Sequence, residues 1–102
     1  MKKTTLLTIM ALATLGLSGC GGNDEFKPTD GMPVNDLFAQ ACASCHGENG
    51  SGKFGFLLKI AGSEDAIEDM AQKIRDGGHI MPAFVNISQS EAISIATYVK
   101  GQ

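Results

Sequence analysis

Cys42, Cys45 and His46 are the residues of this chain whose types and spacing could do chemistry. They lie within the stretch "ACASCHGENG" at positions 41–50. Two thiols and an imidazole within five residues can hold a metal ion, exchange disulfides, or attach a haem. The surrounding sequence separates these three possibilities.

A zinc site would need a fourth ligand, and His79 is the one available to complete a set of two cysteines and two histidines. Cys45 and His46 are neighbours, so on a helix their side chains point about 100° apart. They would not easily converge on one ion. A second compact pair of ligands is missing as well, and the spacing therefore argues against zinc.

A thiol–disulfide motif belongs at the start of a helix that follows a strand, where the helix N-terminus lowers the pKa of the first thiol. Here the pair comes at the end of an apolar helical stripe, where the helix dipole has the opposite sign. The chain shows no alternation of strands and helices around it. Disulfide exchange is therefore disfavoured.

Haem attachment needs this order of residues. The two thiols of C-x-x-C-H add to the two vinyl groups of the porphyrin, and the imidazole that follows binds the iron. We therefore predict one covalent haem c, attached through Cys42 and Cys45, with His46 as an iron ligand.

The first nineteen residues are typical of an export signal. Lys2 and Lys3 precede an apolar run without charges that is shorter than the ~20 residues of a membrane span. The run ends in "LSGC", which resembles the bacterial lipobox. The resemblance implies cleavage before Cys20 and acylation of that cysteine. An ordinary signal with an incidental cysteine, or an uncleaved anchor, is the alternative.

The sequence is thus expected to divide into a lipoprotein signal (1–19), a lipidated cysteine with a flexible tether (20–31) and one domain (32–102). Without Lys2 and Lys3, six basic side chains face eleven acidic ones, a formal charge of −5. This charge argues against nucleic acid as a partner and against an electrostatic grip on anionic lipid. Membrane attachment would fall to Cys20. A domain this small is expected to need a cofactor for stability.

Three helices are expected, and the fold class is all-α. The first carries an apolar stripe from Val34 to Cys45, with Pro33 in its first turn. The second has Ser63 as its expected N-cap and stops at Gly77. The glycine-rich stretch between these two helices is expected to be a loop with one short turn.

The third expected helix opens at Ser88, which has the spacing of a capping box with Glu91. Its apolar residues repeat with helical period and predict one buried face. Those residues are Ala92, Ile95, Ala96 and Val99, with Tyr98 alongside.

Three segments together resemble the class I c-type cytochromes: "CASCHGENGSG", "IRDGGHIMPAF" and "ISQSEAISIATYV". The resemblance implies three main helices wrapped around one haem, His46 and Met81 as axial ligands, and Phe38 packed near Ile95 and Tyr98. Two positions depart from the family pattern. Val34 stands where a glycine is frequent, and Gly55-Phe56 stands where a Gly-Pro step supplies the carbonyl for the histidine N–H.

Met81 is the preferred sixth ligand because it lies in a loop after the glycine stop, with Pro82 holding the chain extended. Met70 lies on a helical stripe and is expected to be core, and Met32 precedes the first helix. His79 is the alternative ligand, or else a solvent-facing loop histidine.

Two protein ligands on the iron leave no place for a substrate, so the sequence predicts a one-electron carrier and not an enzyme. We expect redox proteins as partners, no nucleic acid and no small-molecule substrate. The expected location is outside the cytoplasm, on the outer side of the cytoplasmic membrane or in the periplasm or outer membrane. The alternatives are a ligand sensor or weak peroxidase with a labile methionine ligand, and an electron-entry subunit of a larger membrane oxidoreductase.

Overall fold

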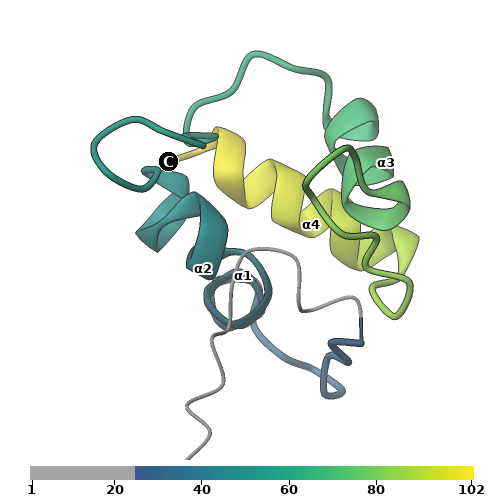
Figure 1. The fold of residues 1–102 in the computed structure, drawn as a ribbon. Coiled ribbons are helices and arrows are strands. Elements are labelled where there is room, and N and C mark those ends of the chain that lie inside the picture. The colour runs from purple at the N-terminus through teal and green to yellow at the C-terminus, as the bar shows by residue number, and fades with distance from the viewer. Residues whose placement is uncertain (1–24) are drawn as a thin grey trace, which may run out of the picture.

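The computed structural model describes residues 25–102, and the described part is all-α, as predicted. α1 spans Val34–Ala41 and α2 spans Ala43–His46, followed by a 3₁₀ turn, η1, at Glu48–Gly50. α3 spans Ile67–Asp76 and α4 spans Gln89–Lys100. Figure 1 shows α3 alongside α4, with α1 and α2 at the opposite end of α4. The export signal and Cys20 lie outside the described residues, so the predicted three-part division stays a prediction.

The first expected helix is broken at Cys42. This residue has φ −119°, which ends α1, and its carbonyl accepts from the N–H of His46 at 2.9 Å to start α2. The apolar stripe predicted from Val34 to Cys45 does run through both helices, but the break at Cys42 turns α2 away from the axis of α1. Cys42 therefore sits at a corner of the chain.

The expected N-cap at Ser63 is wrong. α3 begins four residues later, at Ile67, because Ser63 closes a local turn in which its hydroxyl accepts from the N–H of Asp65 at 3.2 Å. Serine hydroxyls make such turns and helix caps with similar ease. The expected stop at Gly77 is confirmed: its N–H bonds to the carbonyl of Lys73 at 2.8 Å.

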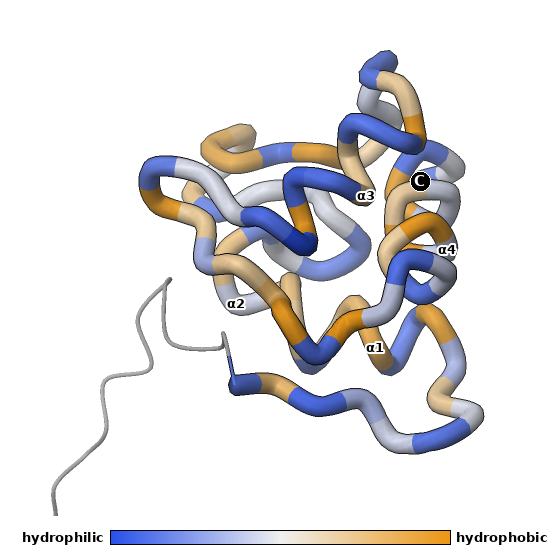
Figure 2. The backbone as a smooth tube through the Cα atoms, turned by 90° about the vertical axis from the view of Figure 1, so that its right-hand side faces the viewer, coloured by the Kyte–Doolittle hydropathy of each residue, from blue (hydrophilic) through white to orange (hydrophobic). Residues whose placement is uncertain are grey.

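The capping box of α4 is confirmed in both directions. The Ser88 hydroxyl accepts from the Glu91 N–H at 3.1 Å, and the Glu91 carboxylate accepts from the Ser88 N–H at 2.9 Å. All four residues of the predicted face are buried, and Figure 2 shows hydrophobic and hydrophilic residues alternating around α4.

The core joins α1 to α4. Phe38 is buried and its ring lies 5.6 Å from that of Tyr98, at an interplanar angle of 48°, as the family resemblance implied. Pairs of this geometry add to the burial energy of the rings. The same cluster contains Leu37, Ala41, Cys42, Ala71, Ile74, Phe84, Ile87, Ala92, Ile95 and Val99.

Part of the expected tether lies against the domain. Phe26 is half-buried and packs on the core, and the carbonyl of Glu25 accepts a long hydrogen bond from Asn86 at 3.5 Å. Phe26 is the aromatic residue of the segment that precedes Met32, and burial of its ring accounts for the contact.

Phe38→Ala should lower the free energy of unfolding of the holo-protein by about 3–5 kcal/mol, because it removes a fully buried ring at the crossing of α1 and α4. Gln40→Ala, on the exposed side of the same helix, should stay within about 0.5 kcal/mol. Denaturant unfolding measures both. Equal effects of the two variants would contradict the packing described.

Candidate functional site: a cavity between the helices

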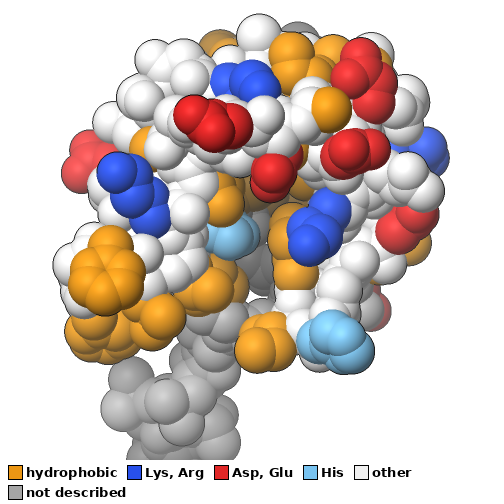
Figure 3. Space-filling view, turned by 90° about the horizontal axis from the view of Figure 1, so that it is seen from above, with side chains coloured by type: hydrophobic (Ala, Val, Ile, Leu, Met, Phe, Trp, Pro, Cys, Tyr) orange, Lys and Arg blue, Asp and Glu red, His pale blue; other side chains and the backbone are white. Residues whose placement is uncertain are grey.

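A cavity of about 260 Å³ opens between the α1–α2 corner, α3, α4 and the two loops beside them. Figure 3 shows it as a hollow, with charged side chains along one edge and hydrophobic side chains along the opposite edge. Its lining is Cys42, His46, Ile60, Ser63, Asp65, Asp69, Met70, Lys73, Ile74, Met81, Ile95, Ala96 and Val99.

Three of the residues predicted from the sequence meet at this cavity. Cys42 is buried at the corner, His46 reaches it from the end of α2, and Met81 reaches it from the loop after α3. Cys45 is half-buried in α2, one residue before His46. Residues nearly forty positions apart thus face one space.

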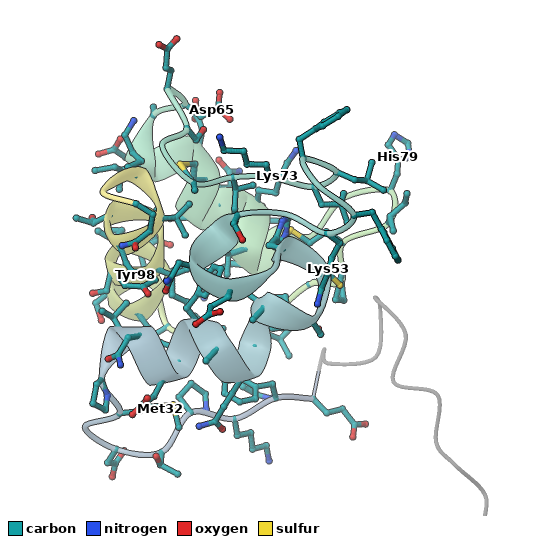
Figure 4. The ribbon with its side chains drawn as sticks, turned by 90° about the vertical axis from the view of Figure 1, so that its left-hand side faces the viewer. Met32, Lys53, Asp65, Lys73, His79 and Tyr98 are labelled. Carbon is teal, nitrogen blue, oxygen red and sulfur yellow. The ribbon has the colours of Figure 1, made fainter. Side chains whose placement is uncertain are left out.

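The other candidates are placed differently. His79 is exposed, and Figure 4 shows it at the outer edge of the molecule. Met70, expected to be core, packs on the core and also lines the cavity. In the described part of the chain, no three histidine, cysteine or acidic side chains are grouped to hold a metal ion, so the zinc set that includes His79 is not brought together.

The imidazole of His46 is oriented by a backbone carbonyl. Its Nδ1 lies 2.7 Å from the carbonyl oxygen of Leu58. A carbonyl can only accept, so Nδ1 must carry the proton and donate it. The other ring nitrogen, Nε2, then has its lone pair available as a metal ligand, and the hydrogen bond fixes the orientation of the ring.

This carbonyl differs from the one expected at the Gly55-Phe56 step. The chain reaches His46 later, at Leu58, which has φ +61°, an uncommon conformation for a residue with a side chain. Two close backbone approaches shape the loop. Gly47 has φ +76° and lies so near Gly52 that a Cβ would collide with its carbonyl, while the Gly52 N–H bonds to the His46 carbonyl at 2.6 Å.

Met81 is held by a tight turn after α3. Gly77 has φ +75°, and a Cβ there would lie 2.8 Å from both the carbonyl oxygen of Met81 and the backbone nitrogen of Ala83. The N–H of Gly78 donates to the same Met81 carbonyl at 2.8 Å. The double glycine therefore does more than end the helix: it lets the chain fold back and bring Met81 to the cavity.

Burial raises the pKa of the Cys42 thiol to about 12, and repulsion from Cys45 adds to the rise. A thiol–disulfide oxidoreductase needs the opposite, a thiolate at neutral pH. The environment of Cys42 thus argues against the disulfide-exchange alternative.

The polar side of the cavity was missed in the sequence analysis. Ser63 and Asp65 come from the loop before α3, and Asp69 and Lys73 come from α3 itself. The signal was present in part. Asp69 and Lys73 are four residues apart, and each precedes an apolar residue of the predicted stripe, so they flank the buried face of the helix.

The comparison with known families decides among the possible functions of this cavity. The family model described as cytochrome C oxidase, cbb3-type, subunit III matches residues 29–99, a range that includes the thiol pair, His46 and Met81. The chain belongs to the monohaem c-type cytochromes. Haem c, covalently bound, is therefore the cofactor of this c-type cytochrome, as the sequence predicted.

A curated relative also bears the name of a cytochrome c. Cytochrome c-550 of Bacillus subtilis (strain 168) is 34% identical to this cytochrome over 59 residues, which are 58% of this chain and 48% of the relative. The chain thus spans about half the length of the curated relative it matches.

Two solved structures are similar. OmcF, outer membrane cytochrome F from Geobacter sulfurreducens, is 30% identical with a TM-score of 0.53, over 67% of this chain and 95% of that one. KustC0563, a c-type cytochrome, has a TM-score of 0.58 over 69% of this chain and 96% of that one. At 22% identity the second likeness concerns the fold alone. The predicted all-α cytochrome c fold is confirmed.

The residues of the cavity fit such a cofactor. A haem is a flat apolar ring with two carboxylates on one edge, and the cavity offers aliphatic walls with a polar group on one side. An imidazole with a committed Nδ1 proton and a thioether sulfur face the same space, and both are ligands that haem iron takes.

Gly77→Ala should lower the free energy of unfolding by about 1–3 kcal/mol, because alanine disfavours the left-handed conformation and its Cβ meets two backbone atoms. The displaced turn should also weaken the approach of Met81 to the cavity. Denaturant unfolding and the far-red absorption of ferric iron bound to methionine sulfur measure the two effects.

Gly78→Ala is the matched control. A Cβ at Gly78 meets nothing within 4 Å. This variant should unfold within about 0.5 kcal/mol of wild type and keep the far-red band. If both glycine variants behaved alike, the fold-back at Gly77 would not be what positions Met81.

Proposed function

We propose that this protein is a one-electron carrier whose haem is attached through Cys42 and Cys45 and ligated by His46 and Met81. The observation that supports it is the convergence of His46 and Met81 on one cavity, His46 from the end of α2 and Met81 from the loop between α3 and α4. When bound, the haem iron supplies the ferric–ferrous couple. Two protein ligands leave no coordination position for a substrate, which fits a carrier better than an oxygenase or a peroxidase.

The protein supplies ligand orientation, charge and exclusion of water. The Leu58 carbonyl fixes the His46 ring, and the thioether of Met81 favours ferrous iron and so raises the potential. We assign the polar side of the cavity, Ser63 and Lys73, to the haem carboxylates. Asp65 and Asp69 stand beside them and favour the more positive ferric form, which tunes the potential downward.

A second candidate is an electron-entry subunit of a larger membrane oxidoreductase. The family description, which names subunit III of a cytochrome c oxidase, favours it. Purification of the tagged protein from membranes under mild conditions separates the two. A carrier should elute alone with one haem, whereas a subunit should elute with further haem proteins at fixed stoichiometry.

Met81→Ala should lower the reduction potential by a measurable part of the roughly 0.8 V range that axial ligands span. It should also open the ferric iron to added cyanide or imidazole and abolish the far-red band. Redox titration and absorption spectra of the holo-protein measure these effects.

His79→Ala is the control, because His79 is exposed and only two residues away. It should leave the potential, the ligand binding and the band unchanged. A wild type without the band, or a band lost only in the His79 or Met70 variant, would show the ligand assignment to be wrong. A wild-type site open to cyanide would favour the sensor or weak-peroxidase alternative.

We also propose that acyl chains on Cys20 anchor the protein outside the cytoplasm, on the cytoplasmic membrane or in the outer membrane. The "LSGC" sequence supports this, and OmcF is by its title an outer membrane cytochrome. Within residues 25–102, every helix is too short or too polar to cross a bilayer. One acyl chain binds only marginally, whereas the several chains of a bacterial lipoprotein bind stably.

Cys20→Ser should release the protein as a soluble holo-form or leave the signal uncleaved, since no sulfur remains to be acylated. Fractionation of cells followed by intact mass checks both outcomes, and wild type should carry the added mass of acyl chains. A processed Cys20→Ser protein that stays on the membrane would mean that a protein partner, not lipid, holds it.

A further inference from the structure

The loop between η1 and α3 presents an exposed hydrophobic tip. We name Phe54–Leu58, "FGFLL", the apolar loop; Lys53 precedes it and Lys59 follows it. Phe54 and Phe56 are 97% and 84% exposed, and the two leucines are also exposed. Soluble proteins rarely expose several neighbouring large apolar side chains unless a binding partner covers them.

Backbone hydrogen bonds fix the conformation of the apolar loop. Lys53 and Leu57 exchange two hydrogen bonds, at 2.7 and 3.1 Å, which close a tight turn beneath the tip. Phe54 takes φ +51°, a left-handed conformation that is costly for a residue with a side chain. The rings are therefore presented outward by a fixed turn.

We propose that the apolar loop inserts into the lipid surface to which the protein is tethered. Lysines at the base of an apolar tip suit a bilayer, since their stems lie along the acyl chains while the amines reach the phosphates. The stretch 49–63 contains Lys53 and Lys59 but no acidic residue, although the chain as a whole is acidic. The net negative charge of the domain, which argues against electrostatic attraction to anionic lipid, is therefore not found in this loop.

The tether brings the same side of the domain to the membrane. This step rests on the proposed anchor at Cys20. Glu25 follows Cys20 by five residues, which span at most about 18 Å. Its carbonyl is held by Asn86, next to Val85, and both Val85 and Ile80 are exposed apolar side chains of the loop that contains Met81.

Figure 4 shows the arrangement. Lys53 and His79 lie on one side of the domain, and the described chain begins on that same side. Lys53 directly precedes the apolar loop and His79 directly precedes Ile80, so the loop and Ile80 lie on the side where the described chain begins. Figure 3 shows hydrophobic side chains gathered along one edge of the cavity. An anchor five residues away holds this side against the bilayer.

A single tryptophan tests the insertion, because the chain contains none. Phe56→Trp keeps the apolar loop apolar, and Ile93→Trp places the probe on α4. Each purified holo-protein is bound to vesicles with and without bromine on the acyl chains. The tryptophan at position 56 should be quenched several-fold more strongly than that at position 93, since inserted apolar faces reach ~5–10 Å into the acyl boundary. The ratio of the two vesicle types cancels any quenching by haem.

Two further variants, made in the Phe56→Trp protein, test the parts of the loop. Phe54→Ser should reduce the bromine quenching. Lys53→Gln with Lys59→Gln should reduce it on anionic vesicles but not on zwitterionic ones. Equal quenching at positions 56 and 93, or no association with vesicles, would overturn the proposal and leave a protein surface as the partner of the loop. Acyl mass on Cys20 is read separately, so loss of the anchor and failure of insertion are distinguishable.

Discussion

The hydrogen bond from Nδ1 of His46 to the carbonyl of Leu58 is the contact on which the site depends. It joins a short helix to a loop twelve residues further on, and it commits the ring proton so that Nε2 remains available as a metal ligand. The bond needs unusual backbone on both sides. Gly47 and Gly52 must nearly touch, and Leu58 must be left-handed. Gly47 and Gly52, which follow C-x-x-C-H, thus allow the backbone conformation that orients the imidazole of His46.

Fold and site share residues in this small domain. Cys42, Ile95 and Val99 belong to the hydrophobic core and also line the cavity. A core of this size has little energy to spare, and part of its apolar surface faces a space that the cofactor fills. Contacts between the folded chain and its covalently attached haem form only in the native state, so they add to the stability of the domain. Haem attachment is therefore expected to contribute to stability as well as to function.

Local signals were readable from the sequence, and tertiary ones were not. The Ser88–Glu91 box and the stop at Gly77 rest on bonds within a few residues, and the structure has both. Ser63 failed as a cap because a local turn competes for its hydroxyl. The break at Cys42, the use of the Leu58 carbonyl and the polar side around Lys73 depend on packing between distant segments. Periodicity does not report such contacts.

The position of Leu58 has a thermodynamic consequence. Its carbonyl accepts the hydrogen bond from His46, the proposed iron ligand, while its side chain belongs to the exposed tip of the same loop. If a docking partner moves the tip, it also moves the acceptor of the His46 ring proton. A shortened hydrogen bond would make His46 a stronger electron donor to iron and favour the ferric state, which would link docking to redox state. By reciprocity, a docking surface that shifts the potential must hold the oxidised and reduced proteins with different affinities, and electron transfer itself then alters how long the protein stays docked.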